Sequence, residues 1–503
     1  MKKITDNKII LSDYPDYLCD ESRVTAINAD CILWPENECD IIDAVALAQE
    51  KNSPITVSAA RTGIVAAAVP LCGGMILSIE KMVEINSPSF DEDKNEWFMT
   101  VGPGVLLQDI ESFLHNHKEK NLFYPPDPTE MSAAIGGTVA TNASGARTYK
   151  YGATRNYIRR LRVVLADGNV IEIKRGEIFA DESNELCFSV SGKEYKIPVP
   201  DYSMPKTKNC AGYFAKPHMD LIDLFIGSEG TLGIISEIEI KLLEKNKECL
   251  SLLSFFNSEN QAFKFVKSIR NDEKLDVEAI EFFGKNTLAL LHKRHEEGGT
   301  DLQDFPKCDA AVYSEFAFNE DEIEEIYELL EEKLQSEGSS TDNSWAGMDY
   351  SETEVLKKFR HAVPETINQI IGERKREIPD LHKIGTDLAV PDENFEQIFN
   401  FYREQLDSAG LQYAIFGHIG NNHLHVNMLP QNENELAEAK KFYKIFAQKA
   451  VELGGTVSAE HGIGKLKKDF LKLMYGERGV EEMKNVKLSL DPKNILGVGT
   501  LIE

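Results

Sequence analysis

Residues 124–145 read YPPDPTEMSAAIGGTVATNASG, and this stretch decides which kind of fold the chain adopts. Its prolines hold the backbone extended at the beginning of the segment. Gly136-Gly137-Thr138 then opens a run of small residues, so a flat ring system could lie directly against the uncovered backbone. Taken alone, the segment is equally compatible with a tight structural turn.

Two further segments rich in small residues lie on either side of it in the sequence. Residues 57–70 read VSAARTGIVAAAVP, so their backbone N–H groups can approach a phosphate closely while Arg61 supplies charge. This first segment is not a G-x-G-x-x-G motif, and no Walker lysine follows it. Residues 224–235 read LFIGSEGTLGII and place glycines between two predicted strands, where the backbone must pass close to another group. Each segment alone is also compatible with a structural turn.

The composition of the chain divides it into three regions, and 503 residues are too many for one compact core. Residues 1–245 are rich in small and β-branched residues, residues 246–454 alternate strand-like runs with charged helices, and residues 455–503 return to glycine-rich motifs. This pattern predicts an α+β fold. The predicted strands lie at 76–79, 161–165, 234–240, 252–256, 311–318 and 412–416, the predicted helices at 260–270, 320–337 and 433–453, and an irregular insertion at 175–213.

The charge balance limits the possible partners. The formal net charge is −28, and a surface this acidic repels nucleic acid and anionic lipid. No apolar run approaches the roughly 20 residues of a membrane-spanning helix, and the N-terminus lacks the apolar stretch of a secretory leader. The eight cysteines form no C-x-x-C pair, which argues against an iron–sulfur cluster or a zinc ribbon. We therefore expect a cytoplasmic protein with reduced thiols and no transmembrane segment.

A cluster of histidines at residues 416–427, FGHIGNNHLHVN, is the strongest indication of chemistry in the sequence. His423, His425 and Asn427 alternate with apolar residues, so on a strand they share one face. His418 precedes a turn that could fold it back toward that face. Converging imidazoles suit a divalent transition metal, and a hydrogen-bonded histidine cluster is the alternative.

A second polar group lies at residues 458–465, which read SAEHGIGK. A carboxylate beside an imidazole, Glu460-His461, could supply a third metal ligand and a base. In isolation this pair is better explained as a capped turn.

The three small-residue segments together, in this order, resemble the FAD-binding domain of the vanillyl-alcohol oxidase and p-cresol methylhydroxylase superfamily. Over nearly the whole chain the resemblance is to its branch of D-lactate, glycolate and D-2-hydroxyglutarate dehydrogenases. It implies a two-subdomain FAD-binding domain of the p-cresol methylhydroxylase type at 1–245, completed by the C-terminal return segment 455–503. It also implies an α+β cap domain with an antiparallel sheet at 246–454.

The resemblance implies that residues from all three segments bind FAD. They are Ser58, Ala59, Ala60, Arg61, Thr62, Gly63 and Val69 at the pyrophosphate, Pro126, Gly136, Gly137, Thr138, Asn142, Gly145 and Gly152 at the isoalloxazine and ribityl chain, and Gly230 and Ile235 near the adenine half. The first loop departs from the more usual Gly-Gly-Gly-Thr-Gly pattern, which leaves its individual contacts open. It contains no histidine, whereas relatives with a covalent flavin carry one there, so we expect FAD to be held non-covalently.

The resemblance also implies the roles of the polar residues. The divalent metal, zinc or alternatively manganese or iron, is bound by the residues that match His418, His425 and Glu460. His461 matches the general base, Asn427 a substrate contact, Arg360 the arginine that holds the substrate carboxylate, and Lys383 a nearby lysine of less regular spacing. The family often has Asp-Gly-Asn where Asn421-Asn422-His423 stands here, and we interpret His423 as a packed histidine rather than a substrate contact.

The reaction implied is oxidation of a D-2-hydroxy acid such as lactate, glycolate or 2-hydroxyglutarate to the 2-oxo acid. His461 would take the hydroxyl proton, the metal would polarise the hydroxyl, and the hydride would pass to flavin N5. We expect a separate electron acceptor, an electron-transfer flavoprotein or an iron–sulfur subunit, and consider a homodimer. Two other classes stay open, a non-redox flavoenzyme resembling alkylglycerone-phosphate synthase and a non-catalytic electron-transfer subunit.

Overall fold

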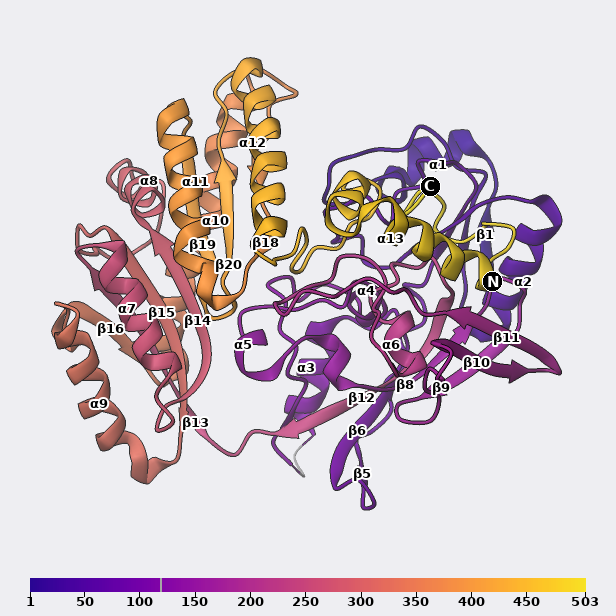
Figure 1. Ribbon diagram of the computed structural model, residues 1–503, viewed down its shortest axis with the longest axis horizontal. Helices are drawn as coiled ribbons and strands as arrows, with labels where there is room; N and C mark the ends of the chain where they lie inside the picture. The colour runs from indigo at the N-terminus through magenta and orange to yellow at the C-terminus, as the bar shows by residue number, and fades with distance from the viewer. Residues whose placement is uncertain (118–119) are drawn as a thin grey trace.

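The computed structural model describes residues 1–117 and 120–503. Figure 1 shows two bodies side by side, one built from the first half of the chain together with the C-terminal residues, the other from the residues between them. Both chain ends lie in the first body. In the part of the chain that the structure describes, no helix has the length and apolar character needed to cross a membrane.

A small sheet near the N-terminus carries the first small-residue segment. Its strand order is β1-β2-β4-β3, with β1 antiparallel and the other three parallel. β2 and β4 are buried along their whole length, as expected of parallel strands covered on both faces. The elements are β1 (Lys2–Ile4), β2 (Cys31–Trp34), β3 (Ile55–Ser58), β4 (Met75–Ser78), α1 (Asn7–Asp13) and α2 (Glu38–Lys51).

A second, antiparallel sheet in the same body has the order β5-β6-β12-β8-β9, and β7 also pairs with β12. Buried and half-exposed residues alternate along β12, which is the period of a strand with one face in the core. The strands are β5 (Ser89–Asp91), β6 (Glu96–Val101), β7 (Leu122–Phe123), β8 (Ile158–Val164), β9 (Val170–Lys174) and β12 (Ile234–Glu244). The helices are α3 (Leu107–Asn116), α4 (Ile135–Thr141), α5 (Thr148–Tyr151) and α6 (Leu221–Phe225).

The insertion at 175–213 is more regular than predicted. It forms an antiparallel hairpin of β10 (Glu185–Val190) and β11 (Lys193–Pro198). Ser191 and Gly192 both have positive φ at the turn, which suits a two-residue hairpin, and the rings of Phe188 and Tyr195 stack across the strands. The prediction was wrong because the exposed polar residues of both strands hide the alternation.

The second body is an antiparallel sheet covered by helices on both faces. Its strand order is β16-β13-β15-β14-β19-β20-β17, and β18 also pairs with β20. The strands are β13 (Glu248–Phe256), β14 (Asp276–Gly284), β15 (Ala310–Phe318), β16 (Ser344–Gly347), β17 (Ile384–Gly385), β18 (Leu388–Ala389), β19 (Tyr413–His418) and β20 (His423–Met428). The helices are α7 (Glu259–Arg270), α8 (Lys285–Glu296), α9 (Ile323–Ser336), α10 (Tyr350–Lys375), α11 (Phe395–Ala409) and α12 (Glu433–Glu452).

Successive residues of β13 show how the two faces are filled. Leu252 belongs to the core that includes α7 and α9, whereas Leu253 packs in a separate core with residues of α8 and α10. The predicted α+β fold with an antiparallel sheet in the cap is therefore confirmed. The domain limits at 245 and 454 stay predictions.

The C-terminal segment returns to the first body through α13 (Lys468–Leu490), which breaks at Gly476. Beyond it, the backbone N–H of Ile55 donates to Ile495 and the N–H of Gly497 donates to Ile55, so the tail lies along the open edge of β3. Before it, the backbone N–H of Cys210 donates to Ser458 and that of Ala459 donates to Asp387. The segment 458–465 thus lies between the two bodies and touches both.

Candidate active site

The hairpin of β19 and β20 sets the positions of the three clustered histidines. Pairing places His418 opposite His423 and Phe416 opposite His425, and Asn422 makes the turn with a φ of 53°. One donor atom from each of the three histidines and one from Glu460 lie within 4.8 Å of one another. The structure therefore brings together the residues predicted as metal ligands, and it adds His423 to them.

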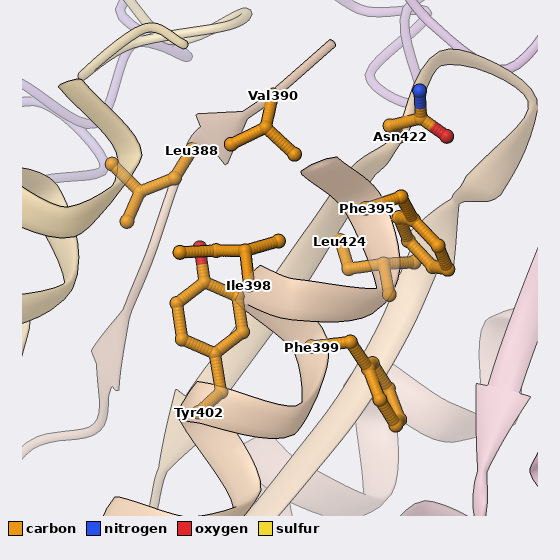
Figure 2. A pocket seen from close by; sticks show the side chains of 8 residues that line it. All are labelled: Leu388, Val390, Phe395, Ile398, Phe399, Tyr402, Asn422 and Leu424. Carbon is orange, nitrogen blue, oxygen red and sulfur yellow. The ribbon is translucent and has the colours of Figure 1, made fainter. Parts of the chain in front are cut away.

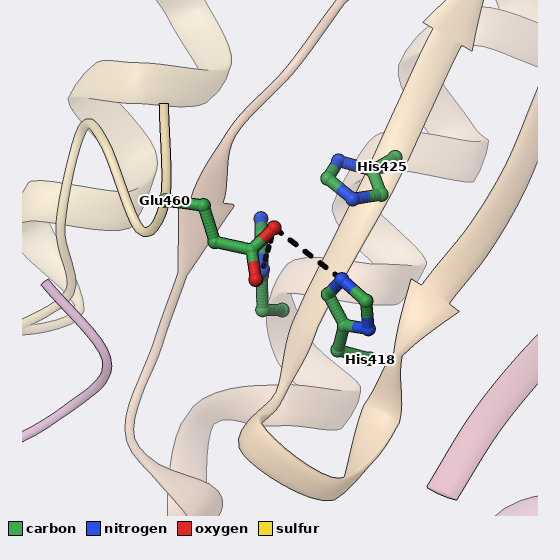
Figure 3. A group of neighbouring side chains, drawn as sticks. His418, His425 and Glu460 are labelled. Atoms are coloured by element: carbon green, nitrogen blue, oxygen red, sulfur yellow. Dashed lines mark ion pairs between the residues drawn. The ribbon is translucent and has the colours of Figure 1, made fainter. Parts of the chain in front are cut away.

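Each of the two predicted histidine ligands is held at one ring nitrogen. His418 Nδ1 hydrogen-bonds to Glu281 Oε1 at 2.5 Å, and its Nε2 lies 3.3 Å from Glu460 Oε2. His425 Nδ1 lies 3.3 Å from the carbonyl oxygen of Thr386. Figure 3 shows His418, His425 and Glu460 facing a shared space, with the ion pair between His418 and Glu460 dashed. The remaining ring nitrogens are thus free to bind an ion.

The Glu460 carboxylate has two different sides. Its Oε1 accepts from the ammonium of Lys208 and from Ser144 Oγ, which lies at 3.2 Å. Its Oε2 faces the histidines. Burial raises the pKa of Glu460, but the charges of His418 and Lys208 outweigh burial and hold this pKa well below the usual range. Glu460 is therefore an anionic donor with one oxygen left for an ion.

The surrounding charges and burial shift the pKa values of His418 and His461 in opposite directions. Burial lowers the pKa of His418, but the Glu281 and Glu460 carboxylates outweigh burial and raise this pKa to about 9. Burial lowers the pKa of His461 more than the charge of Asp387 raises it. His461 is therefore neutral near pH 7 and can accept a proton, as a general base must.

A buried carboxylate, Asp387, holds the Glu460-His461 pair in place. Its Oδ1 accepts the backbone N–H of Glu460 at 3.1 Å, and its Oδ2 accepts that of His461 at 3.0 Å. The same Oδ2 lies 3.3 Å from His461 Nδ1 and accepts from Ser458 Oγ and Lys467 Nζ. Asp387 therefore fixes which way the His461 ring faces and leaves its Nε2 as the free nitrogen.

Arg360 lies on α10 within a buried network of charges. Its Nη2 is 3.6 Å from Glu281 Oε1, so Glu281 touches both His418 and Arg360. Nearby, Arg147 donates to Glu315 at 2.9 Å and lies 3.8 Å from Asp127. Arg147 is thus committed to carboxylates of the protein, whereas the ion pair of Arg360 with Glu281 is longer.

The two other predicted substrate residues lie on the strands beside the histidines. Asn427 on β20 pairs with Gly385, where a Cβ atom would lie 3.1 Å from Asn427 Oδ1, so the glycine allows this close approach. Lys383 is half-buried immediately before β17. Burial lowers the pKa of Lys383, and the nearby charge of Arg23 lowers it further.

The three small-residue segments meet around α4. A Cβ on Gly136 would lie 2.7 Å from the Pro103 carbonyl oxygen, and one on Gly145 would lie 1.9 Å from that of Asp127, so both positions require glycine. A Cβ on Gly137 would meet only Ala59, at 3.7 Å, which joins the second segment to the first.

The third segment attaches to the same helix. The backbone N–H of Gly227 donates to Val139, and that of Glu229 donates to Ala140. A Cβ on Gly230 would lie 3.8 Å from Val57, which brings this segment beside the first one as well. Residues that the sequence places far apart thus form one surface of exposed backbone.

The first loop offers polar atoms without partners. The buried hydroxyls of Ser58 and Ser78, at the ends of two parallel strands, make no hydrogen bond with any described residue. A Cβ on Gly63 would meet nothing within 4 Å. Arg61 stacks over the Tyr17 ring and lies 3.5 Å from Glu80, so its charge is shared with the protein. Unpartnered donors and open backbone fit a phosphate-bearing cofactor such as FAD.

The remaining predicted cofactor residues have ordinary structural roles that are compatible with such a site. Val69 and Pro126 are buried, the Thr138 hydroxyl donates to the Ile135 carbonyl, Asn142 takes a φ of 50°, Gly152 a φ of 79°, Ile235 is half-buried on β12, and Ala60 and Thr62 are half-buried in the first loop.

The donor set of the histidine cluster also fits a metal. Imidazole nitrogens and one carboxylate oxygen are typical ligands of divalent zinc, iron and manganese. Carboxylate or carbonyl groups behind the ring nitrogens, here Glu281 and Thr386, are typical supports of such ligands.

Sequence reasoning missed Asp387, Glu281 and Lys208. Glu281 stands between two apolar residues and Asp387 directly before an apolar run, and a buried charge without a function is unfavourable, so these patterns could have indicated them. Lys208 lies in a polar segment where nothing in the sequence distinguishes it.

A small cavity behind the histidine hairpin is not part of the site. It holds about 10 Å³ and is lined mainly by apolar side chains of β18, α11 and β20, as Figure 2 shows. Asn422 at its rim donates to Asp392. The space suits one water molecule at most, so it is a packing defect.

Comparison with known families gives two matches. Residues 29–174 match the family described as FAD binding domain. Residues 245–501 match the family described as FAD linked oxidases, C-terminal domain. The two matches cover both bodies of the structure and most of the candidate site.

Three curated relatives align over nearly the whole chain. D-lactate dehydrogenase of Anaerostipes hadrus is 30% identical, over 99% of this chain and 96% of the relative. Glycolate oxidase subunit GlcD of Bacillus subtilis strain 168 is 27% identical, over 94% and 88%. D-2-hydroxyglutarate dehydrogenase of Stutzerimonas stutzeri strain A1501 is 27% identical, over 93% and 90%.

A solved structure of alkyldihydroxyacetonephosphate synthase superposes with a TM-score of 0.63 at 16% identity, covering 94% of this chain and 76% of that one. At this identity the likeness concerns the fold alone.

Proposed function

The chain belongs to the family of FAD-linked oxidases, and from this premise we propose that it oxidises a 2-hydroxy acid to the 2-oxo acid. The resemblance found in the sequence and the FAD-linked oxidoreductase class are confirmed by the family matches and the relatives. The observation that carries the proposal is the convergence of three histidines, Glu460 and His461 between the cap and the backbone surface around α4.

FAD would be held by the three small-residue segments. When bound, it accepts the hydride of the substrate. Exposed backbone at Gly63 and Gly137 and the unpartnered hydroxyl of Ser58 support this placement. No histidine lies between Ser58 and Val69, which supports non-covalent binding. Acid precipitation of the purified protein would then release free FAD.

The divalent metal would be held by His418, His425 and Glu460, with zinc expected and manganese or iron as alternatives. When bound, it lowers the pKa of the substrate hydroxyl. Glu281 and the Thr386 carbonyl fix the two rings, and Lys208 with Ser144 fixes the carboxylate.

His461 would remove the hydroxyl proton. A hydride can leave the carbon only as the hydroxyl loses its proton, so a base must stand beside the substrate oxygen. The His461 ring stacks on that of His425 with centroids 5.6 Å apart, which places it next to a predicted metal ligand. Asp387 at Nδ1 leaves Nε2 to receive the proton and stabilises the cation that forms.

Arg360 would hold the substrate carboxylate. A guanidinium binds a carboxylate through two parallel hydrogen bonds, and Arg360 keeps enough exposure to do so. Asn427 and Lys383 would complete the substrate surface from the adjoining strands. Arg147 and Lys208 are each paired with a carboxylate of the protein.

Several properties follow from the family and stay proposals. They are preference for the D enantiomer, slow reaction with oxygen, delivery of electrons to an electron-transfer flavoprotein or iron–sulfur subunit, a possible homodimer and a cytoplasmic location.

A direct test is to mix the anaerobic protein with lactate, glycolate and 2-hydroxyglutarate, both enantiomers where they exist, and to follow the flavin absorbance. Bleaching by at least one acid is expected because the hydride reduces the flavin. Absence of bleaching by every acid, in protein that carries FAD and metal, would contradict the proposal. It would favour the non-redox chemistry of alkylglycerone-phosphate synthase.

A further inference from the structure

We propose that His423 is a fourth protein ligand of the metal, so that the site consists of three imidazoles and one carboxylate. The inference rests on the metal site of the proposed function and goes beyond its three ligands. His423 is completely buried, its Nε2 lies 3.1 Å from the Asp387 carboxylate, and its Nδ1 makes no hydrogen bond with any described residue. Buried polar atoms without partners are rare, and an absent ligand is one of the few explanations for them.

The surroundings of His423 repeat those of the other two histidines. His418 has a carboxylate, Glu281, at the nitrogen turned away from the shared space, and His425 has the Thr386 carbonyl there. His423 Nε2 lies 3.1 Å from Asp387 Oδ1. Oxygen acceptors behind metal-bound imidazoles orient the rings and make the ligands more basic. All three histidines therefore have the support that a metal ligand requires.

The other nitrogen of His423 faces the ion site. Its Nδ1 lies 3.9 Å from Glu460 Oε2, the oxygen that also faces His418 Nε2. The ring centroids are 5.4 Å apart for His418 and His423, 5.5 Å for His418 and His425, and 4.6 Å for His423 and His425. The three rings thus lie close to one another, and one possible ligand atom from each of them and from Glu460 lies within 4.8 Å of the others.

Simple packing does not explain this arrangement. Asp387 can satisfy Nε2, but burial removes Nδ1 from water without giving it a partner among the described residues, which is unfavourable. Coordination through Nδ1, with Asp387 behind Nε2, gives each nitrogen a function.

Four protein ligands change what the metal can do. A zinc ion bound by four protein groups in a tetrahedron has no open position, whereas catalytic zinc usually keeps one for water or substrate. Substrate binding at this site would therefore require an ion with five or six ligands. Zinc could meet this requirement by taking a fifth ligand, and manganese or iron, the alternatives to zinc, accept higher coordination numbers as well.

The test uses the FAD-loaded protein depleted of metal and reloaded with zinc or cobalt. X-ray absorption at the zinc edge of the wild type counts its imidazole ligands, and three are expected. His423→Asn, which installs the common family residue, should show two imidazoles and an altered cobalt spectrum. It should bind zinc at least about tenfold more weakly, since even groups behind the ligands contribute about 10- to 100-fold to affinity.

His361→Asn makes the same change at an exposed position on α10 and should leave all three measurements unchanged. Two imidazoles in the wild type would overturn the inference, even if His423→Asn failed to fold. Unchanged zinc affinity and an unchanged cobalt spectrum in a folded, FAD-loaded His423→Asn protein would overturn it as well. Failure of the wild type to bind zinc or cobalt would overturn the proposed metal site together with this inference. A wild type that binds zinc through only two imidazoles would overturn this inference alone.

Discussion

The histidine hairpin, residues 413–428, and the flavin segment, residues 124–145, contribute different kinds of atoms to the same candidate site. In the histidine hairpin the chemistry is carried by side-chain nitrogens, three of which have an oxygen acceptor of the protein nearby. In the flavin segment it is carried by backbone that glycines leave uncovered. The hairpin should therefore be sensitive to the loss of side-chain atoms, and the flavin segment to their addition.

The largest effect is expected for His425→Ala. Removing this ring should abolish turnover and metal retention, because it takes away one of the predicted metal ligands, while FAD stays bound to the three small-residue segments. Elemental analysis, flavin absorbance and dye-linked turnover of one preparation would show this. Full activity in metal-free protein would contradict the prediction, because it would show that the side-chain nitrogens of the histidine hairpin are not needed for the reaction.

His461→Asn should come next. Loss of a positioned base reduces the rate by a factor of about 10² to 10⁴. FAD, metal and substrate affinity should remain near wild type, because His461 is assigned to neither cofactor. Anaerobic single-turnover reduction of the flavin measures the rate. A change of only a few-fold would show that another group takes the proton.

Asp387→Asn should have a smaller effect on the same step. Hydrogen bonds to charged groups contribute about 1.5–3 kcal/mol, so losing the charge behind His461 should slow flavin reduction roughly 10- to 100-fold. Substrate affinity should stay unchanged in metal-saturated protein, since Asp387 is buried behind the ring. Metal binding should weaken as well, because the same carboxylate lies behind His423.

Asp309→Asn is the matched control for that variant, since it removes a carboxylate from the exposed ion pair with Lys285. It should leave the rate unchanged. An equal loss of rate in both variants would mean that Asp387 acts only through overall stability.

The smallest expected effect is one of stability in the flavin segment. Gly145→Ala places a methyl group against the Asp127 carbonyl oxygen and should lower the free energy of unfolding by about 1–3 kcal/mol, with loss of FAD. Gly63→Ala, where the added Cβ meets nothing, should keep wild-type stability. Thermal unfolding and the ratio of flavin to protein would distinguish them. Equal stability of both variants would mean that the backbone of the flavin segment can move and make room for the added methyl group.

The same contrast explains how much could be predicted from the sequence. The strand period of β12 and the alternation of His423, His425 and Asn427 are local patterns, so they could be interpreted without the structure. The glycines of the flavin segment could be noticed, but their necessity depends on Pro103 and Asp127 lying within contact distance.

The missing parts of the site depend on residues distant in sequence. Lys208 reaches Glu460 only because the return segment lies beside the insertion, and Glu281 reaches His418 only because β14 pairs with β19. His423 was interpreted as packed because the lack of a partner for its Nδ1 becomes visible only when its neighbours are known. A single charged residue in a segment without a motif carries no local pattern that predicts a contact with a residue distant in sequence.

The tail that lies along β3 has a consequence for how the chain is made. Ile55 pairs with residues near the end of the described chain, so the edge of the N-terminal sheet stays uncovered during synthesis until those residues leave the ribosome. Unpaired strand edges in such intermediates are prone to aggregation. This pairing spans almost the whole sequence, and such pairings form slowly. We therefore expect nascent chains shortened before residue 495 to engage chaperones that bind exposed strands, and the full chain to be released from them.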